Sequence, residues 1–586
     1  MFIIRRPPYL KTIIGISIFF LVLLFLQYKQ ERLTLTKDSP EVSAPAVETQ
    51  EEVESAVSDR LVEDKRVYNG HNGTKLEHVY VTVFDQSTVQ ENDISFYDLN
   101  ESYKRYSNLD SGPKLDILFQ TGTEQGPNEK GFVSLGTDKP NATIELRGRS
   151  SRLEAQKSYK IRLRDNAGLW YGQKVLNLNK HADDRTRVRN KLAFDYFQKI
   201  PDLISLRTNF VQLHVRDLTE PHSDGTFKDY GLYTHVEQLN EDALAARGLN
   251  PDGHLYKAEN FEFHRYPDQL KHQDDPGYSK REFERILKIN GNENHDELLQ
   301  MLDDINDMSK SFDEVFNKYF QEDNYLTWLA SNILFGNYDT MSTNYYLYSP
   351  LNSDKWYFVP WDFDKALGRD AERKDSLPEW QQGIQRYWGT VLHRRYLRDP
   401  KNVAALTAKM EQLSKIINEK ATKELINSYY PVVHNLALRK PDLSYLSIEA
   451  SQFDESYNRL EMVTSRYKQE YFNSLEVPMP IFLHYERQKD QDVFSWEASY
   501  DLQSDKLSYE FQLSNTPDFH SFIARMENAE NFTHSIKALP AGRYYWRIIV
   551  RDGKGNEQIP FDYYRDNNGI MYWGVQQIIV SGGSPS

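Results

Sequence analysis

The sequence predicts an α+β protein of several domains, in which the central region is preceded by an apolar segment and followed by a β-sandwich. Three observations support this prediction. The chain has 586 residues, which is too long for one hydrophobic core. Alternating apolar patterns dominate residues 76–258, and helical spacing dominates residues 281–472. After residue 478, short alternating segments separated by turns return.

The composition excludes several classes of protein. A formal charge of −15 argues against nucleic-acid binding, which needs a concentrated basic face. The absence of cysteine excludes disulfides, zinc–thiolate sites and cysteine nucleophiles. It also argues against a secreted eukaryotic protein, because such proteins usually carry disulfide bridges.

Residues 12–26 are continuously apolar and follow three basic residues. With its flanks this segment approaches the roughly 20 residues that span a bilayer. The basic residues favour a cytoplasmic N-terminus. A cleaved signal peptide is the alternative, but the nearest small-residue cleavage pattern, Ala44-Pro-Ala46, lies far downstream. We therefore expect residues 1–29 to form a cytoplasmic stub and a single uncleaved transmembrane helix, with the rest of the chain outside the cytoplasm.

Residues 30–75 are rich in Glu, Ser, Thr, Val and Pro and show no periodicity. Such a composition is typical of a flexible acidic linker. The linker would hold the next domain, predicted at residues 76–475, away from the membrane.

The large domain begins with strands, predicted by alternation at residues 79–84, 115–119 and 143–146. Residues 145–163 then indicate two strands joined by a loop of small polar residues. In such a loop, backbone amides and the hydroxyls of Ser150 and Ser151 can bind phosphate oxygens. Arg147 or Arg149 can add positive charge.

Lys157 shares the face of its strand with Tyr159, Ile161 and Leu163. A lysine on an apolar face needs a buried partner, and a phosphate group would supply one. Lys160 points to the opposite face and is the second candidate. The structural alternative is a surface lysine at the start of a strand.

Apolar spacing next predicts an amphipathic helix at residues 185–200, with Asp183 or Asp184 as its N-cap. Asp195 is the only acidic residue inside this helix. Two strands follow, then a connector containing Glu237, a short helix and a strand that carries Tyr256. These elements are expected at residues 208–215, 230–239, 241–247 and 254–258.

The stretch most informative about function is residues 324–368. A buried helix is followed by a polar loop and by two aromatic strands within residues 345–359, which predict a β-hairpin. The hairpin would bring Asp362 and Asp364 back beside Asp339.

These residue types suit phosphoryl transfer. That reaction needs a carboxylate to orient the attacking hydroxyl and oxygen ligands to hold Mg²⁺ on nucleotide phosphates. Asp339, Asn344 and Asp362 follow the order in which protein kinases present these groups, although His-Arg before the first Asp and Gly after Asp-Phe are missing. The structural alternative is that these side chains cap turns and that Asp362 and Asp364 lie in a solvated loop.

Several separated motifs resemble the signature of the CotH family, a family of spore-coat proteins and atypical protein kinases. The resemblance covers roughly residues 76–475 and implies a two-lobed, kinase-like fold. The matching motifs are Gly-Asn-Tyr-Asp339, Asn344-Tyr-Tyr-Leu-Tyr, Trp356-Tyr, Pro-Trp-Asp362-Phe-Asp, Arg147-Gly-x-Ser-Ser and Lys157-Ser-Tyr.

The resemblance also implies roles for these residues. Asp339 would be the catalytic base, and Asp362 and Asn344 would bind Mg²⁺, with Mn²⁺ as an alternative metal. Asp364 would be a reserve metal ligand. Lys157 would bind the phosphates of ATP.

Three further residues are assigned to nucleotide binding. Glu237 would lie at the hinge between the lobes. In the family the adenine ring lies between two aromatic walls, which we match to Tyr256 and Trp356. The predicted helix at residues 185–200 contains no Glu, so the acidic partner of the phosphate-binding lysine is left open.

The remaining segments complete the architecture. Helical spacing predicts a helical C-lobe that includes residues 281–289 and 298–320 and continues after the hairpin at residues 377–397, 403–430 and 446–472. Pro478 and Pro480 then break the helical pattern. Residues 478–582 predict a β-sandwich whose Trp496, Tyr509 and Phe511 resemble a fibronectin type III-like module.

The sequence therefore predicts a membrane-anchored, extracytoplasmic kinase that transfers the γ-phosphoryl group of ATP to Ser or Thr of a protein, in a bacterial periplasm or at a cell surface. The alternative is a non-catalytic adhesion or envelope-assembly protein whose kinase-like scaffold and C-terminal domain bind polysaccharide or an envelope protein. A metal-dependent hydrolase built on Asp339, Asp362 and Asp364 is weaker, because no histidine lies within that stretch.

Overall fold

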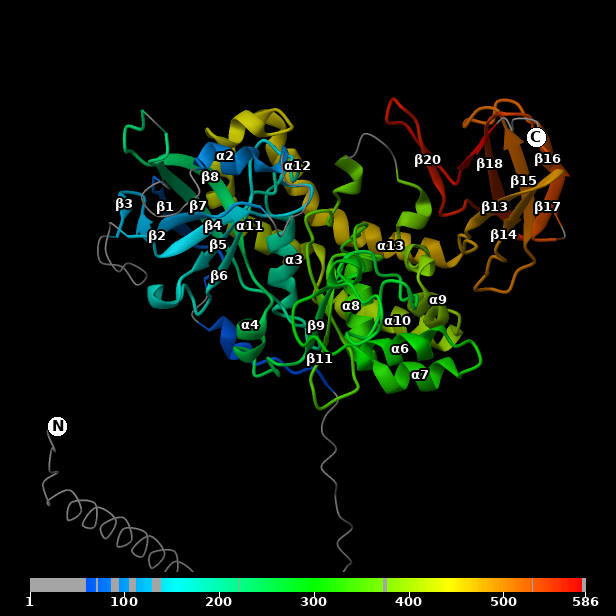
Figure 1. The fold of residues 1–586 in the computed structure, drawn as a ribbon, viewed down its shortest axis with the longest axis horizontal. Helices are drawn as coiled ribbons and strands as arrows, with labels where there is room; N and C mark the ends of the chain where they lie inside the picture. Colours follow the sequence, from blue (N-terminus) through cyan, green and yellow to red (C-terminus); the bar gives the residue numbers. More distant parts are fainter. Residues whose placement is uncertain are drawn as a thin grey trace, which may run out of the picture. The chain divides into compact units, whose positions relative to one another are not determined.

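Figure 1 shows a computed structural model of the chain. It describes residues 60–69, 72–85, 94–104, 112–128, 139–220, 222–372, 377–529 and 531–581. The predicted transmembrane segment at residues 12–26 lies outside these ranges. Within them, no helix combines the length and the apolar character needed to cross a bilayer.

The N-terminal part is an eight-stranded sheet that closes on itself, because β1 pairs with β2 as well as with β7. Valines and leucines from the inward faces of these strands fill its interior. The strand order is β1 (Leu76–Val83), β7 (Thr208–Asp217), β8 (Lys228–Glu237), β6 (Val175–Asn179), β5 (Tyr159–Leu163), β4 (Ala142–Leu146), β2 (Leu115–Thr123) and β3 (Gly126–Pro127).

The start of the domain corrects the predicted extent of the linker. Leu61 is buried, and the Arg60 guanidinium forms an ion pair of 2.7 Å with Asp202. Glu63 accepts a hydrogen bond of 3.2 Å from buried Arg247. Residues 60–69, which the sequence assigns to a flexible tether, therefore pack against the domain through specific charged contacts.

Helix α3 (Arg189–Phe197) lies between the closed sheet and the helical part of the domain (Figure 1). The sequence predicts an amphipathic helix here, but every residue of α3 except Asp195 is buried. The difference arises because α3 is covered on both sides. Phe194 and Phe197, for example, pack edge-to-face on Phe363, which follows the hairpin.

A second, four-stranded sheet carries the aromatic hairpin. Its order is β10 (Leu287–Ile289), β9 (His254–Ala258), β11 (Tyr345–Ser349) and β12 (Tyr357–Pro360). Helix α8 (Glu322–Leu334) packs on this sheet through Trp328, whose ring centroid lies 4.5 Å from that of Phe358. Residues 281–289, predicted to be helical, instead form the short helix α5 (Lys280–Phe283) and strand β10.

The rest of the domain is helical, as the sequence predicts. Between residues 377 and 390, however, the described chain forms only single 3₁₀ turns, at Glu379–Gln381 and Gln385–Gly389. The helices are α4 (Glu241–Ala245), α6 (Asp296–Asn306), α7 (Phe312–Tyr319), α9 (Val391–Leu397), α10 (Pro400–Leu413), α11 (Glu419–Ala437), α12 (Phe453–Asn458) and α13 (Val463–Leu475).

The C-terminal residues form two larger antiparallel sheets around a shared core that contains Trp496, Tyr509 and Phe511, the three residues expected there. One sheet is β13 (Leu483–Gln488), β14 (Gln491–Trp496) and β17 (Thr533–Lys537). The other is β16 (Ala524–Met526), β15 (Ser508–Ser514), β18 (Gly542–Arg551) and β19 (Glu557–Gln558), with β22 (Gln576–Val580) also on β18. A separate antiparallel pair consists of β20 (Tyr563–Arg565) and β21 (Met571–Trp573).

Candidate functional site

The β11–β12 hairpin begins and ends at residues with unusual backbone conformations. Asn344 precedes β11 with φ +60°, and Asp362 follows β12 with φ +56°. These values lie in the left-handed region, which is unfavourable for residues other than glycine and is tolerated best by Asn and Asp. Such strain is concentrated at functional sites, because the surrounding structure has to hold it in place.

The loop after α8 brings Asp339 and Asn344 together. The side-chain nitrogen Nδ2 of Asn344 donates hydrogen bonds to Asp339 Oδ2 at 3.0 Å and to the Asp339 backbone carbonyl at 2.9 Å. Lys365 Nζ lies 3.1 Å from Asp339 Oδ2, and the Asp339 side chain is 34% exposed. Asn344 and Lys365 thus orient the Asp339 carboxylate from two directions, and the carboxylate is still accessible to solvent. In the Asn344 side chain, the amide oxygen Oδ1 is the atom suited to bind a metal.

Asp362 lies in an environment that disfavours its own charge. Burial and the neighbouring Asp364 raise the pKa of Asp362 to about 6, against the opposing attraction of Arg147 and His181. Asp339 adds a smaller repulsion in the same direction. A divalent cation would relieve this repulsion, so the donor set at Asp362 and Asp364 fits a metal with oxygen ligands.

Asp364 has a histidine and a lysine as neighbours instead. Burial would raise the pKa of Asp364, but a hydrogen bond and charge from His181, together with the charge of Lys365, lower it below its usual value. His181 Nδ1 lies 3.9 Å from Asp364 Oδ2, and its Nε2 lies 3.4 Å from Asn190 Nδ2. The two aspartates of Asp-Phe-Asp are therefore electrostatically different.

The first turn of α3 holds the segment that follows Asp362. Asn190 Oδ1 accepts a hydrogen bond of 2.9 Å from the Phe363 amide. Arg189 Nε donates to the Leu367 carbonyl at 3.0 Å, and its other nitrogens pair with Asp184 and Glu372. Both residues therefore bond the backbone of the loop that carries Asp362 and Asp364.

Sequence reasoning assigned no role to His181 or Lys365. Lys365 directly follows Asp-Phe-Asp, so its position was a usable signal. His181 lies in the segment between β6 and α3, and no local pattern links it to Asp364. Its left-handed backbone (φ +48°) and its approach to Asp364 depend on tertiary structure.

Arg147 reaches the aspartates from the loop between β4 and β5. Its guanidinium lies 5.5 Å from the centroid of the Trp361 ring and donates a hydrogen bond to Asn179. Burial lowers the pKa of Arg147, and the nearby carboxylates of Asp362 and Asp364 oppose that shift. Arg147 is thus a cation from the N-terminal sheet that faces the Asp-Phe-Asp segment.

The loop after Arg147 is tightly folded. Gly148 has φ +85°, and a Cβ at this position would lie 1.9 Å from Ser151 Oγ. Ser151 Oγ donates to the Arg147 carbonyl at 3.1 Å, and Ser150 is exposed with its carbonyl bonded to the Leu153 amide at 2.9 Å. Ser150 and the neighbouring Arg149 are therefore the exposed polar residues beside Gly148.

Lys157 has partners in its own loop. Its Nζ donates to the carbonyls of Arg152 and Glu154, each at 2.7 Å, and lies 4.2 Å from the centroid of the Tyr103 ring. In this structure Arg147, not Lys157, is the cation beside Asp362. Lys160, the second candidate, lies 3.7 Å from Glu145 on β4.

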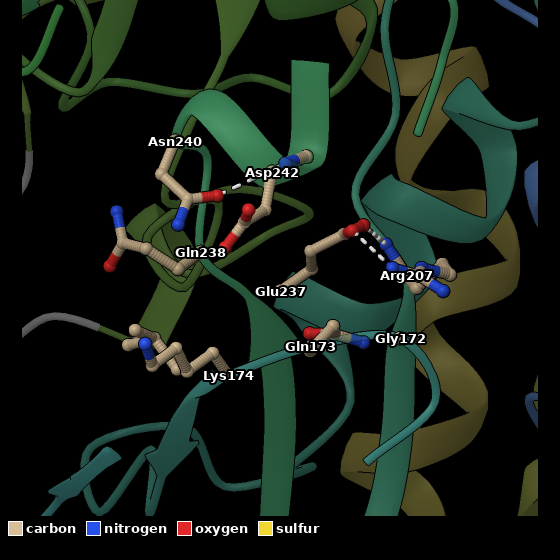
Figure 2. Close-up of a pocket in the computed structure, with 10 residues that line it drawn as sticks. Gly172, Gln173, Lys174, Arg207, Glu237, Gln238, Asn240 and Asp242 are labelled. Atoms are coloured by element: carbon tan, nitrogen blue, oxygen red, sulfur yellow. Dashed lines mark hydrogen bonds and ion pairs between the residues drawn. The ribbon is translucent and has the colours of Figure 1, made fainter. Parts of the chain in front are cut away.

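Glu237 lies in a small pocket beside the connector between β8 and α4 (Figure 2). It accepts hydrogen bonds from Arg207 at 2.5 Å and from Arg247 at 2.6 Å. Burial would raise the pKa of Glu237, but Arg247 and Arg207 outweigh it and lower that pKa to about 2. Gln238 and Asn240 also line the pocket. Because Glu237 pairs with two arginines, it stabilises the end of β8 and the connector that follows.

Tyr256 and Trp356 do not enclose a space for adenine, which corrects the expectation of two aromatic walls. Both residues are fully buried, and their ring centroids lie 5.9 Å apart at an interplanar angle of 36°. A sandwiched ring needs roughly 7 Å between its walls, about twice the optimal distance between contacting carbon atoms. The Tyr256 hydroxyl instead bonds His295 Nδ1 at 2.8 Å, so both rings belong to the core.

Asp339, Asp362 and Asp364 do not converge on a single point. In the described part of the chain, one group of three acidic or histidine side chains has ligand atoms all within 4.8 Å of one another, and it lies in the C-terminal domain. At the hairpin, Asp362 and Asp364 interact strongly, whereas Asp339 pairs with Lys365. Asp339 is thus set apart from the pair of carboxylates formed by Asp362 and Asp364.

Comparison with known proteins identifies the class and the family to which the chain belongs. A family model described as CotH kinase protein matches residues 144–469. Because this match covers more than half of the chain, the chain belongs to the CotH kinase family, as its motifs predict.

Inner spore coat protein H of Bacillus subtilis (strain 168) is 30% identical over 234 residues, which are 39% of this chain and 59% of that protein. The match therefore spans less than two thirds of the relative. Two solved structures show a weaker likeness. A complex of HipA, HipB and operator DNA from Shewanella oneidensis MR-1 has a TM-score of 0.21 and 11% identity, covering 57% of this chain and 67% of that chain. The Helicobacter pylori proinflammatory kinase CtkA has a TM-score of 0.22 and 8% identity, covering 58% and 94%. Likeness at this level supports no further conclusion.

Proposed function

We propose that the protein is a protein kinase that transfers the γ-phosphoryl group of ATP to Ser or Thr hydroxyls. The observation that carries this proposal is the position of Arg147, which follows β4 and whose guanidinium lies 5.5 Å from the centroid of the Trp361 ring, next to the Asp362-Phe-Asp364 segment at the end of the hairpin. A cation beside paired carboxylates, contributed by separate parts of the fold, suits a nucleotide phosphate and its metal. Membership of the CotH kinase family supports the same reaction class.

In this proposal Asp339 acts on the acceptor. The acceptor hydroxyl oxygen attacks the γ-phosphorus, the bond to the bridging oxygen breaks, ADP leaves and the hydroxyl proton passes to Asp339. Asn344 and Lys365 orient the Asp339 carboxylate, and its 34% exposure leaves it open to a substrate. Lys365 also balances charge near the transferred group.

Asp362 and Asp364 would hold Mg²⁺ or Mn²⁺, with the Asn344 carbonyl oxygen as a further ligand. A bound metal would neutralise charge on the nucleotide phosphates. Arg147 supplies a cation to the phosphates, and Ser150 and Ser151 offer hydroxyls in the same loop. Lys157 can join them only after giving up its two carbonyl partners.

The test is phosphate transfer from γ-labelled ATP with Mg²⁺ or Mn²⁺ to casein, followed by identification of the labelled amino acid. Asp339→Asn and Asp362→Ala should each lower the rate at least about 100-fold, which is about 2.7 kcal/mol of barrier. Asp354→Asn is the matched control, because Asp354 is an exposed carboxylate in the turn of the same hairpin. It should leave the rate unchanged.

Equal labelling by the wild type and both site variants would reject the kinase proposal. It would favour the alternative of an adhesion or assembly protein, whose C-terminal domain would then be tested for binding to cell-wall polysaccharide.

We also propose that the chain is anchored in the membrane through residues 12–26, with the kinase-like domain outside the cytoplasm. The apolar run and the basic residues before it support this topology. Protease added to intact cells, with an outer membrane permeabilised where one is present, should digest the C-terminal domain. Its protection there, combined with digestion after lysis, would reject the topology.

A further inference from the structure

Two loops of the C-terminal domain bring three carboxylates together, away from the hairpin site. One loop, residues 501–505, precedes β15, and the other, residues 552–556, joins β18 to β19. One ligand oxygen from each of Asp501, Asp505 and Asp552 lies within 4.8 Å of the others. The proposed kinase reaction gives these residues no role.

Asp501 carries an oxygen that is buried without a partner. The residue is 6% exposed, and its Oδ1 accepts hydrogen bonds of 2.9 Å from the amides of Gln503 and Asp505. Its Oδ2 is buried and has no hydrogen-bond partner. A buried anionic oxygen in this state is costly, and a cation between the two loops would satisfy it.

The other two carboxylates have polar or cationic neighbours. Asp552 is 7% exposed and accepts hydrogen bonds from the amides of Lys554 and Asn556 at 2.9 and 2.8 Å, and from the Asn556 side chain at 2.7 Å. Lys554 Nζ lies 3.1 Å from Asp505 Oδ2, without the alignment of a hydrogen bond. One half-exposed ammonium group cannot neutralise three carboxylates.

We infer that this cluster binds a divalent cation with a preference for oxygen ligands, of the Ca²⁺ class. Three carboxylates on two loops can be completed by water to the six to eight oxygen ligands that Ca²⁺ takes in flexible geometry. The small ion Mg²⁺ requires a nearly ideal octahedron and is the weaker match. Binding displaces the Lys554 ammonium group into solvent.

The cation also strengthens the junction between the two domains. Gln503 Nε2 donates to the Leu475 carbonyl at the end of α13 at 2.8 Å, and Asn556 Nδ2 donates to the Glu476 carbonyl at 2.9 Å. Both loops that supply the carboxylates therefore contact the same helix end. Fixing the loops to each other fixes the sandwich to α13.

Isothermal titration of the full-length protein with CaCl₂ tests the inference. The Asp362→Ala variant serves as the parent protein, so that the proposed active site does not contribute. We expect one site with a dissociation constant of roughly 10⁻⁴ M, as in Ca²⁺-binding extracellular modules. Asp501→Asn should weaken binding at least about tenfold and should abolish the Ca²⁺-dependent rise in Tm of the parent.

Asp566→Asn is the matched control. Like Asp501 Oδ1, Asp566 Oδ1 accepts hydrogen bonds from the backbone amides two and four residues later, at 2.9 and 2.8 Å. Unlike Asp501, Asp566 belongs to no cluster of three carboxylates among the described residues. Its replacement should change turn stability and leave Ca²⁺ affinity unchanged.

Lys554→Gln gives an independent test, because it removes the competing charge without altering a ligand. Its Ca²⁺ affinity should rise severalfold. No binding by the parent at about 5 mM Ca²⁺, or equal affinity of the parent and a folded Asp501→Asn variant, would overturn the inference. If Asp501→Asn does not fold, unchanged or weaker binding by Lys554→Gln would overturn it.

Discussion

Burial acts on Asp362 and Glu237 in the same direction, but their partners give the two carboxylates opposite properties. Asp362 faces Asp364, and its pKa is raised to about 6. Glu237 lies between Arg207 and Arg247, and its pKa is lowered to about 2. A carboxylate that repels its neighbour is suited to bind a cation, whereas a fully paired carboxylate contributes to stability.

Glu237→Gln should destabilise the protein by about 3–5 kcal/mol, because two buried guanidinium groups would lose their shared anion. Urea denaturation at pH 7 measures this loss. Glu455→Gln is the control, since Glu455 in α12 forms an exposed ion pair with Arg459, the residue that ends this helix. This substitution should lower the free energy of unfolding by at most about 0.5 kcal/mol. Equal effects of the two substitutions would contradict a stabilising role for Glu237.

The same ion pairs predict a dependence on pH. The pKa of Glu237 is lowered on folding from 4.5 to about 2. The stability that Glu237 contributes is therefore fully present above pH 4.5 and is lost as the pH falls toward 2. The free-energy difference between the wild type and Glu237→Gln should shrink over that interval, and a difference that grows there would refute this assignment.

Arg147 and Lys157 can be separated as phosphate ligands by kinetics. Arg147→Met should raise the KM for ATP at least about tenfold, because it removes the cation that faces Asp362. Lys157→Met should have a smaller effect, since its amine is bonded to loop carbonyls. The reverse order would assign the phosphates to Lys157, as the family resemblance implies, and would mean that the loop rearranges around ATP.

Helix α3 acts as a clamp on the segment after β12. Asn190 holds the Phe363 amide and Arg189 holds the Leu367 carbonyl, so the helix fixes the backbone on which Asp362 and Asp364 are carried. Asp362 can keep its left-handed conformation because the next peptide group is bonded in this way.

Asn190→Ala should therefore loosen the Asp-Phe-Asp segment without unfolding the domain. Hydrogen exchange of peptides that cover residues 360–368 should become faster, and kcat should fall roughly tenfold through mispositioning. Asn290→Ala is the control. It also removes one hydrogen bond between an asparagine side chain and the backbone, in which Asn290 Nδ2 donates to the Lys288 carbonyl at a strand end outside the site. It should change neither measurement, and unchanged exchange in Asn190→Ala would rule out the clamp.

These contacts also explain which features the sequence predicts. The hairpin with Asp339, Asn344 and Asp362 follows from local spacing, because a loop and two short aromatic strands determine it. Strand β6 was not predicted, although Asn177 and Asn179 alternate with its apolar residues, and both asparagines are buried. Their partners, such as the Val236 carbonyl and Arg147, come from distant parts of the chain.

The predicted adenine site between Tyr256 and Trp356 also depends on tertiary structure, which the sequence does not show. Tyr256 and Trp356 both lie in suitable aromatic segments, but whether two such rings leave a gap or pack together depends on how β9 and the hairpin meet. Likewise, nothing local to Lys157 predicts that the loop carbonyls of Arg152 and Glu154 bond its amine. Residue type and spacing therefore predict which segments lie close together, and tertiary contacts determine which side chains meet there.

The helical part of the domain and the C-terminal sandwich keep separate cores but meet at an apolar junction. Phe561 and Met479 belong to the same buried cluster as the helical C-lobe. The Phe561 ring packs edge-to-face on Trp380 at 5.1 Å, and Tyr500 stacks on Trp388 at 5.3 Å. A polar contact between Arg394 and Glu497 accompanies them.

This apolar junction predicts that residues 59–586, which form one compact unit, unfold as one cooperative system. Calorimetry should show a single transition whose calorimetric and van't Hoff enthalpies agree. Phe561→Ala should lower the Tm of that transition, because the cavity beside Trp380 costs about 3–5 kcal/mol. Phe522→Ala, at a 43% exposed position of the sandwich, is the control and should leave the Tm nearly unchanged. If the two parts fold independently, the intact protein would instead show two transitions, and Phe561→Ala would move at most one of them. If the protein unfolds in a single transition, any interaction that stabilises the junction raises the Tm of both domains. A cation bound at Asp501 would therefore also stabilise the kinase-like domain.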